Sequence, residues 1–444
     1  MASAAEQLVA NLNFSSFAKA TELKQRIWFT LGALVIYRLG TYIPMPGIDP
    51  VALAQSMSQG AGGLLEMFNM LAGGAVGRMA IFALNIMPYI SASIIVQLMT
   101  TVSPHLEALK KEGESGRKQI NQYTRYGTVL LAVVQAFGIA IGLENSSNYV
   151  IDPGWMFRIS TVITLTGGTV FLMWLGEQIT QRGIGNGTSL IIFAGIVAEF
   201  PGSFFRAFEM ARTGSISGLF LALLLVVMVV VVVAIVFMER AQRRLLVQYP
   251  KRQQGNRMVQ GETSHLPMKL NAAGVIPPIF ASSLLLLPAT FASFNPQWAP
   301  EWLTTVTTLL NHGQPLYMAL YAALIIFFCF FYTAIIVNPN DTADNLKKYG
   351  GFIPGIRPGK RTAEHIDYVL TRLTVVGAIY ITAVCLLPEL VIAELGTQFY
   401  LLVGTSLLIL VSVTMDTVAQ VQSHLLAHQY EGLIKKARLR GARK

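Results

Sequence analysis

Basic side chains crowd into two long polar segments of this chain, Glu239–Lys269 and Asn338–Arg372, each about thirty residues or more. The clustered residues are Arg243, Arg244, Lys251, Arg252 and Arg257 in the first segment, and Arg357, Lys360 and Arg361 in the second. Guanidinium and ammonium groups bind carboxylates and phosphates, and such contacts weaken as salt rises. Charge runs beside apolar segments often only fix membrane orientation. Segments this long also fit a docking surface for an acidic or RNA-bearing partner, and both interpretations stay open.

Other chemistry is not indicated by the residue patterns. The sequence contains no nucleotide-binding, metal-ligand or nucleophile–base motif. Its six histidines are scattered through polar segments, where solvated imidazoles are the better interpretation. The two cysteines, Cys329 and Cys385, lie within apolar stretches and imply no disulfide framework. The sequence therefore predicts a protein that is not an enzyme and that uses no metal or cofactor.

Ten apolar runs dominate the chain, in which 53% of residues are hydrophobic and only 13% are charged. Most reach the roughly 17–25 residues that a helix needs to cross about 30 Å of hydrocarbon. The runs are Ile27–Ile43, Met79–Val102, Gly127–Leu143, Ile159–Ile179, Thr188–Phe200, Ile216–Met238, Leu270–Phe291, Leu316–Val337, Leu373–Leu390 and Phe399–Val418. The fifth is long enough only if its helix begins near Ile184. We expect an all-α polytopic membrane protein with ten transmembrane helices.

The loop charges predict the orientation of these spans. Most of the 33 basic residues fall in the two tails and in every second loop. The positive-inside rule places those segments, and so both termini, in the cytoplasm. An even number of spans requires the same. The net charge of +10 follows first from this topology, with anionic membrane lipids as a second reason. Residues 1–20 lack the pattern of a cleavable signal peptide.

The spans divide into five and five, which predicts five parts. These are a cytoplasmic tail (1–26), a first transmembrane half (27–200), an outer hinge loop (201–215), a second half (216–418) and a C-terminal cytoplasmic tail (419–444). Because five is odd, the second half must be inverted relative to the first, as in many transporters. A small-solute secondary permease is thus the alternative interpretation. The span centres hold almost no acids or histidines, which counts against proton or sodium coupling.

The first outer segment, residues 41–78, has an unusual character. After the turn Pro44–Gly47 it contains an apolar stretch, Gly62–Leu71, that could form a helix far too short to cross a bilayer. An amphipathic helix on the membrane surface and a re-entrant helix in a protein-lined cavity are both open. Prolines interrupt two of the runs, Pro88 in the second and Pro277-Pro278 in the seventh, and we expect them to bend those helices.

From about Leu23 to Lys436 the chain resembles the SecY family, the central subunit of the bacterial protein-conducting channel. The resemblance rests on long, unusual strings in order along the chain. They are Phe68-Asn69-Met70 with Gly73-Gly74; Asn85–Ile94; Lys111–Arg117; Gln122–Gly127; Trp174–Thr180 with Arg182–Gly187; Lys251–Gly255; and Ala343–Lys348 with Pro354–Gly359. So many ordered matches make coincidence implausible.

The resemblance implies a central pore between the two halves, with a role for each feature above. The short segment within residues 63–78 resembles the plug that closes the outer funnel; its residues are Leu64, Leu65, Met67, Phe68, Asn69, Met70 and Leu71. The apolar ring at the pore waist corresponds to Ile86, Ile90, Thr188, Ile192, Ile279 and Ile409. An aliphatic residue is usual at the Thr188 position, where a hydroxyl would wet the constriction slightly. Such a ring can gate by dewetting.

The second and seventh runs resemble the lateral gate, through which apolar segments leave for lipid. Its candidate residues are Pro88, Ser91, Gln97, Asn271, Pro277, Pro278 and Ser282. The basic loops resemble docking sites for the SecA motor ATPase and the translating ribosome, with Arg357 and the Lys251-Arg252 pair as the main candidates. Partner subunits resembling SecE and SecG, and a nascent or secretory polypeptide as the client, are implied by the family alone. The resemblance implies a location in the bacterial cytoplasmic membrane.

Overall fold

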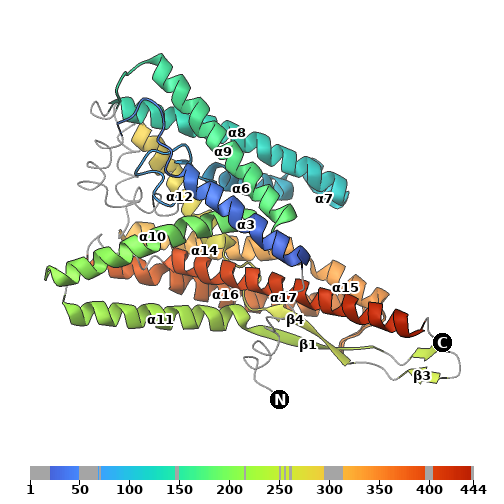
Figure 1. Cartoon of the computed structure of the whole chain (residues 1–444). Coiled ribbons are helices and arrows are strands. Elements are labelled where there is room, and N and C mark those ends of the chain that lie inside the picture. Colours follow the sequence, from blue (N-terminus) through green and yellow to red (C-terminus); the bar gives the residue numbers. More distant parts are fainter. Residues whose placement is uncertain are drawn as a thin grey trace. The chain divides into compact units, whose positions relative to one another are not determined.

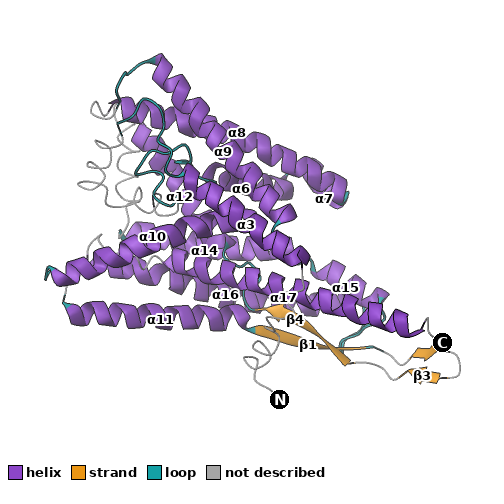
Figure 2. Ribbon diagram, in the orientation of Figure 1, coloured by secondary structure: helices purple, strands orange, loops and turns teal. Residues whose placement is uncertain are grey.

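The fold is built mainly of helices, with a few short strands (Figure 2). The computed structural model describes residues 21–49, 69, 72–145, 150–214, 217–249, 252–254, 257–259, 263–294, 314–395 and 404–441. Each of the ten predicted apolar runs falls largely on one helix. These helices are α3 (Thr21–Gly40), α6 (Met87–Val102), α8 (Glu114–Asn145), α9 (Trp155–Arg182), α10 (Gly187–Arg212), α11 (Gly218–Arg240), α12 (Ile276–Phe294), α14 (Pro315–Ile336), α16 (Lys360–Leu395) and α17 (Gly404–Gly441) (Figure 1).

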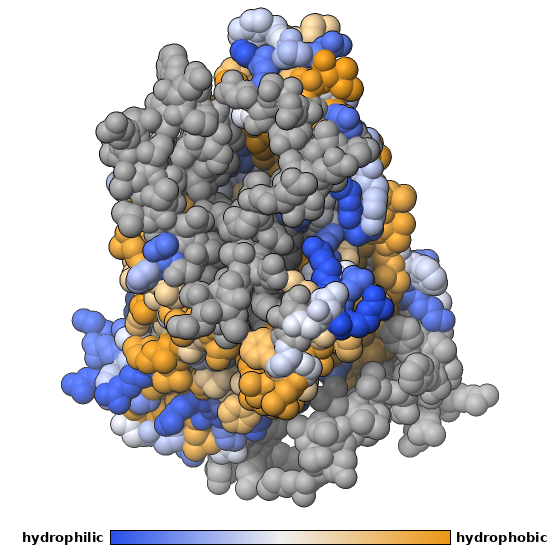
Figure 3. All heavy atoms as spheres, turned by 90° about the vertical axis from the view of Figure 1, so that its left-hand side faces the viewer, coloured by the Kyte–Doolittle hydropathy of each residue, from blue (hydrophilic) through white to orange (hydrophobic). Residues whose placement is uncertain are grey.

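Seven helices in the described part of the chain are long and apolar enough to cross a membrane. The shorter apolar helices include Met87–Val102 and Ile276–Leu285. The surface of α11 shows which solvent these helices need. Its strongly apolar side chains Leu219 and Phe237 are 84% and 71% exposed. Apolar residues also form continuous areas beside separate polar patches on the face drawn in Figure 3. Lipid, not water, is the solvent that suits such surfaces.

The chain forms two compact units. The first comprises Met1–Gly202, Ser293–Trp298 and Val413–Lys444, and the second comprises Ser203–Ala292 and Ala299–Ser412. In the first unit α8 packs against α6 and α9, and α3 packs against α9. In the second unit α14 and the short α15 (Pro339–Lys348) pack against α16.

Small residues and ion pairs hold the helices of the first unit together. The α8 residues Ala136 and Ala140 are fully buried, which lets neighbouring backbones approach closely, as in other membrane helix bundles. Arg125 of α8 donates two hydrogen bonds to Glu177 of α9, at 2.9 and 2.6 Å. At the opposite ends of the same helices, Arg158 pairs with Glu144 at 2.5 Å. The short helix α7 (Pro104–Lys111) leads from α6 into α8.

The prolines of the second and seventh runs do not bend helices, contrary to the sequence prediction. Pro88 lies in the first turn of α6, and Pro277 and Pro278 follow directly after the first residue of α12. A proline in the first turn loses no intrahelical hydrogen bond, and its fixed φ suits the start of a helix. The preceding residues 79–86 are turns rather than helix, and Met79 and Asn85 there adopt positive φ values of 39° and 48°.

The helix that carries the fifth run, α10, is extended beyond the run at its C-terminal end, whereas the sequence predicted an extension at its N-terminal end. Residues 183–186 are not helical, and α10 begins only at Gly187. It then continues through Pro201 to Arg212, so most of the predicted 201–215 loop is helical. The 26 residues of this helix are enough to span a membrane by length and composition.

Strands in the segment 239–269 were not predicted. Strand β1 (Gln242–Gln248) pairs antiparallel with β4 (Thr263–Lys269), with Leu245 opposite Leu266. Toward the tip of this hairpin, β2 (Arg252–Gln254) pairs with β3 (Arg257–Val259). The hairpin follows α11 directly and leads into α12 (Figure 1).

Candidate functional site

The two basic segments predicted as docking loops form one structure in the second unit. Strand β1 continues its pairing with the second segment, because Gln248 and Phe352 exchange two backbone hydrogen bonds of 2.9 and 3.0 Å. Beneath this pairing lies a shared apolar core of Leu245, Met268, Ile353, Ile366 and Leu370. We call the hairpin β1–β4 together with residues 338–361 the basic module.

The basic module presents the predicted docking residues to solvent wherever their side chains are described. Arg243 and Arg244 on β1 are exposed, as are Arg357, Lys360 and Arg361. Arg252 is the first residue of β2 and Arg257 the first residue of β3, whereas Lys251 lies outside the described residues. The turn that carries Arg357 is held by Thr362, whose hydroxyl donates to the Arg357 carbonyl at 3.1 Å.

Cations at the start of α16 are not explained by helix stability. Lys360 and Arg361 occupy its first turn, where the positive end of the helix dipole disfavours them by typically about 0.3–1 kcal/mol each. Exposed positive charge kept at such a position suits the binding of an anionic partner.

The waist candidates of the first unit lie at the N-terminal ends of two helices, within their first two turns. Ile86 caps α6, and the Ile90 amide donates to its carbonyl at 3.1 Å, so the two side chains share one helix face. Thr188 and Ile192 have the same spacing on α10. Ile86, Ile90 and Ile192 are buried. Ile279, on the first turn of α12, and the buried Ile409 belong to the second unit.

Thr188 takes part in capping its own helix. The side-chain oxygen of Asn186 accepts hydrogen bonds from the Thr188 amide at 3.2 Å and from its hydroxyl at 2.7 Å. An amide oxygen that satisfies the second N–H of a helix is a favourable N-cap. The hydroxyl therefore donates to Asn186, which was not foreseen from the sequence.

The lateral-gate candidates lie on or next to α6 and α12. Ser91 is buried on α6, and the Gln97 amide nitrogen donates to Ser93 at 3.2 Å. The Gln97 side-chain oxygen is buried and has no hydrogen-bond partner among the described residues. On α12, the Ser282 hydroxyl donates to the Ile279 carbonyl at 3.0 Å.

Asn271 closes the turn that precedes α12. Its side chain donates to Glu239 at 2.6 Å and to the Gly274 carbonyl at 3.1 Å, and it accepts from the Gly274 amide at 3.0 Å. Glu239 is the next-to-last residue of α11. The amide thus ties the end of α11 to the start of α12, and sequence reasoning missed Glu239 as its partner.

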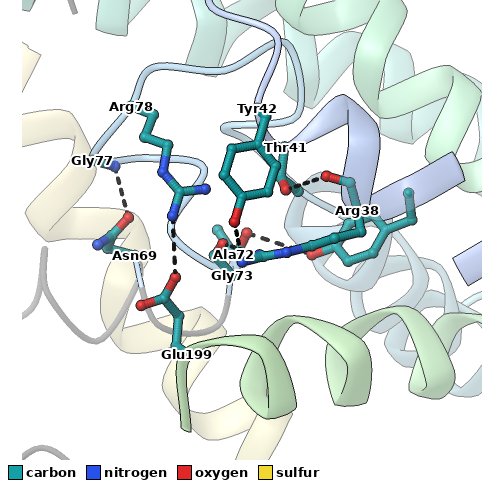
Figure 4. Close-up of polar contacts among 10 residues, drawn as sticks. Arg38, Thr41, Tyr42, Asn69, Ala72, Gly73, Gly77, Arg78 and Glu199 are labelled. Carbon is teal, nitrogen blue, oxygen red and sulfur yellow. Dashed lines mark hydrogen bonds and ion pairs between the residues drawn. The ribbon is translucent and has the colours of Figure 1, made fainter. Parts of the chain in front are cut away.

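Of the predicted plug residues, Asn69 alone belongs to the described part of the chain. The other six, Leu64, Leu65, Met67, Phe68, Met70 and Leu71, lie outside the described residues. The Asn69 side-chain oxygen accepts from the Gly77 amide at 2.6 Å, and its carbonyl accepts from the Gly74 amide at 2.8 Å. Arg38, Arg78 and Glu199, which the sequence did not single out, surround this segment (Figure 4). Within the described residues, no group of three His, Cys, Asp or Glu side chains could hold a metal ion.

Comparison with known proteins gives one consistent result. Residues 80–418 match the family model described as SecY. "Protein translocase subunit SecY" of Escherichia coli (strain K12) is 56% identical over 424 residues, covering 95% of this chain and 96% of that protein.

Solved structures share the fold at low sequence identity. One described as "The structure of a protein conducting channel" is 17% identical, with a TM-score of 0.68, and the match covers 90% of this chain and 92% of that one. "Sec61 in the Canine ribosome-channel complex from the endoplasmic reticulum" is 16% identical, with a TM-score of 0.62 and the same coverage. With its multiple apolar helices and these matches, the chain is a multi-pass membrane protein that belongs to the SecY family.

Proposed function

We propose that this chain is the protein-conducting channel subunit of a bacterial translocase, which passes unfolded secretory polypeptides across the cytoplasmic membrane and releases apolar segments into lipid. The observation that carries the proposal is the 56% identity to a protein translocase subunit over 95% of the chain. A permease is not favoured, because the relatives are translocase subunits and the similar structures are protein-conducting channels. No enzyme activity is proposed.

The pore waist would be the ring Ile86, Ile90, Thr188, Ile192, Ile279 and Ile409. Three of its members, Ile86, Ile90 and Ile192, are buried within the first two turns of α6 and α10. A constriction of aliphatic side chains excludes water and ions when idle, because wetting apolar surface is unfavourable. The same flexible side chains can part around a moving polypeptide.

The lateral gate would lie between α6 and α12. Release of a nascent helix then follows the transfer energies that insert any membrane helix, roughly −0.3 to −0.6 kcal/mol for each Leu, Ile, Phe or Val at its centre. Both helices have prolines in their first turn. Each also follows a turn that contains a residue with positive φ, which is Asn85 before α6 and Gly274 before α12. Turns at both helix starts would let the two helices tilt as rigid elements.

The basic module would be the cytoplasmic docking surface for a motor ATPase and for the ribosome. Its support is that Arg243, Arg244, Arg357, Lys360 and Arg361 are all exposed and belong to segments that share one apolar core. A similar channel is described in a ribosome complex. Small membrane subunits like SecE and SecG would complete the channel, and both termini would lie in the cytoplasm.

Reconstitution tests this function. The chain is purified with its small subunits, placed in vesicles, and supplied with a motor ATPase, ATP and an unfolded precursor. Precursor should become protected from added protease inside the vesicles, and it should stay accessible without ATP. An intact complex that protects no precursor with any motor, but moves small solutes, would contradict the proposal and favour a permease.

A further inference from the structure

The segment between Asn69 and α6 has an unusual backbone. Residues 72–79, here the return segment, contain three positions with positive φ, namely Gly73, Gly74 and Met79. Its apolar base is fully packed, because Ala72, Ala75, Val76 and Ala80 form a buried cluster. A non-glycine residue such as Met79 keeps a left-handed conformation only where surrounding contacts impose it.

Helix α10 supplies the first of these contacts. A Cβ atom added to Gly73 would lie 3.0 Å from the Cα of Gly195, so backbone meets backbone at this point. One helical turn further along α10, Glu199 pairs with Arg78 at 3.6 Å, and a Cβ on Gly74 would overlap its carboxylate. The Glu199 side chain is only 17% exposed, so this pair is partly shielded from solvent and salt.

Helix α3 and the residues directly after it supply a second set of contacts to the return segment. Arg38 donates to the Gly73 carbonyl at 2.7 Å and to the Tyr42 hydroxyl at 2.9 Å. The Tyr42 ring lies against two guanidinium groups, 4.8 Å from that of Arg38 and 4.3 Å from that of Arg78 (Figure 4). The aromatic face thus brings two cations onto one segment, an arrangement that cation–π attraction favours.

The two sets of contacts form one cluster around the return segment, which we call the polar clamp: Arg38, Tyr42, Arg78 and Glu199. Upstream, the return segment is bonded to Asn69, the last described residue of the predicted plug. Downstream, it leads through residues 80–86 to Ile86 and Ile90. The clamp therefore fixes the chain between these two features.

We propose that the polar clamp is a positioning device for the channel, which anchors the return segment to α3 and α10 and so holds Ile86 and Ile90 in the sealed arrangement when no polypeptide is present. This rests on the proposed function. Arg38, Tyr42, Arg78 and Glu199 are positioning residues, since they act on the waist through the return segment: Arg38 bonds its backbone, and Glu199 and the Tyr42 ring contact its Arg78. Loss of the Arg78–Glu199 pair frees one side of the segment while the buried apolar base remains.

Charge substitutions test the clamp in the reconstituted complex by measuring ion permeability without precursor. Glu199→Arg places a third cation beside Arg38 and Arg78 and should raise the idle permeability roughly 5- to 30-fold, the range that a shift of one to two kcal/mol in a two-state equilibrium gives. Arg78→Glu should raise it less, because Arg38 can pair with the new carboxylate. The double variant Arg78→Glu with Glu199→Arg restores opposite charges and should recover at least part of the seal.

The matched control is the pair Arg158–Glu144, which has similar exposure and also stacks on an aromatic ring, Trp155. Arg158→Gln removes an equivalent contact that does not touch the return segment, so it should leave the idle permeability unchanged. Hydrogen exchange gives a second measurement for the milder Glu199→Gln. Its amides at residues 72–79 should exchange faster than in the wild type, while those of α8 should not.

Two results would overturn the proposal. One is wild-type permeability and wild-type amide protection in Glu199→Arg and Glu199→Gln. The other is a double swap that leaks as much as the worse single variant while its α8 amides remain protected. A wild-type complex that moves no polypeptide would contradict the proposed function instead, and the amide comparison would still decide whether the clamp anchors residues 72–79.

Discussion

At the scale of single residues, glycines set how closely the segments of the first unit approach. Gly167 and Gly168 are neighbours on α9 but face different surroundings. A Cβ on Gly168 would overlap the backbone carbonyl of Ile81, whereas nothing lies within 4 Å of a Cβ on Gly167. A backbone carbonyl cannot rotate away as a flexible side chain can. Gly168 is therefore needed for the turn before α6 to lie against α9.

This contrast predicts opposite effects of one methyl group. Gly168→Ala should destabilise the protein by about 1–3 kcal/mol, the usual cost of overpacking. Gly167→Ala should be neutral or stabilising by up to roughly 1 kcal/mol, because alanine favours helix. Thermal unfolding of the two variants in detergent, side by side, measures the difference. Equal midpoints for both variants would show that the close approach is not as described.

At the scale of elements, the basic module depends on the alternation of buried and exposed side chains along β1. Leu245 is buried in the module's core and Leu246, the next residue, is 40% exposed. Leu245→Ala should loosen the module, since removing a buried leucine side chain typically costs about 2–5 kcal/mol. Limited proteolysis should then cut the hairpin faster, whereas Leu246→Ala should behave as wild type. Similar cleavage rates in both variants would contradict the shared core.

The same module should bind its partner mainly by charge. Arg357→Glu is expected to weaken binding of the motor ATPase about tenfold or more at low salt, because it replaces attraction by repulsion, and less at high salt, where screening is strong. Lys118→Glu, at an exposed lysine of α8 in the first unit, is the control of equal charge change. Titrations at two salt concentrations measure this. Equal losses in both variants would point to net charge rather than to the module.

Much of the element order could be predicted from the sequence, because apolar run length and loop charge report directly on membrane helices. The helix ends could not. Pro88 reads as a kink in the run Met79–Val102, yet the turn at residues 79–86 is set by tertiary contacts of the return segment and Phe82. The hairpin was missed although the sequence pair Gly255-Asn256, between the residues of β2 and β3, is of the type that favours a two-residue hairpin connection.

The candidate site residues stay predictions. The family strings led to the waist, gate and docking residues, and the structure places Ile86 and Ile90 on one face of α6. Pairings between distant residues had no signal in a single sequence. Glu239 with Asn271, and Arg78 with Glu199, lie 32 and 121 positions apart, and only folding brings them together.

At the scale of the whole molecule, the orientation of the spans can be tested with introduced cysteines. Both native cysteines are buried, so their background reactivity with a membrane-impermeant maleimide should be low. Arg244→Cys and Arg361→Cys should react only from the cytoplasmic side. Ser217→Cys, just before α11, should react only from the outer side. Labelling of all three from one side would contradict the proposed topology.

The central claim, that the apolar waist contacts a polypeptide in transit, is tested most directly by cross-linking. Ile86→Cys and Ile279→Cys complexes are loaded with a secretory chain that is arrested midway and carries one cysteine, and disulfide formation is measured. Both positions should cross-link to the arrested chain and not to free precursor, whereas Ile163→Cys, 67% exposed on α9, should not cross-link. Cross-links at Ile163 equal to those at the waist, or none at either waist position in an intact complex holding the chain, would contradict the account.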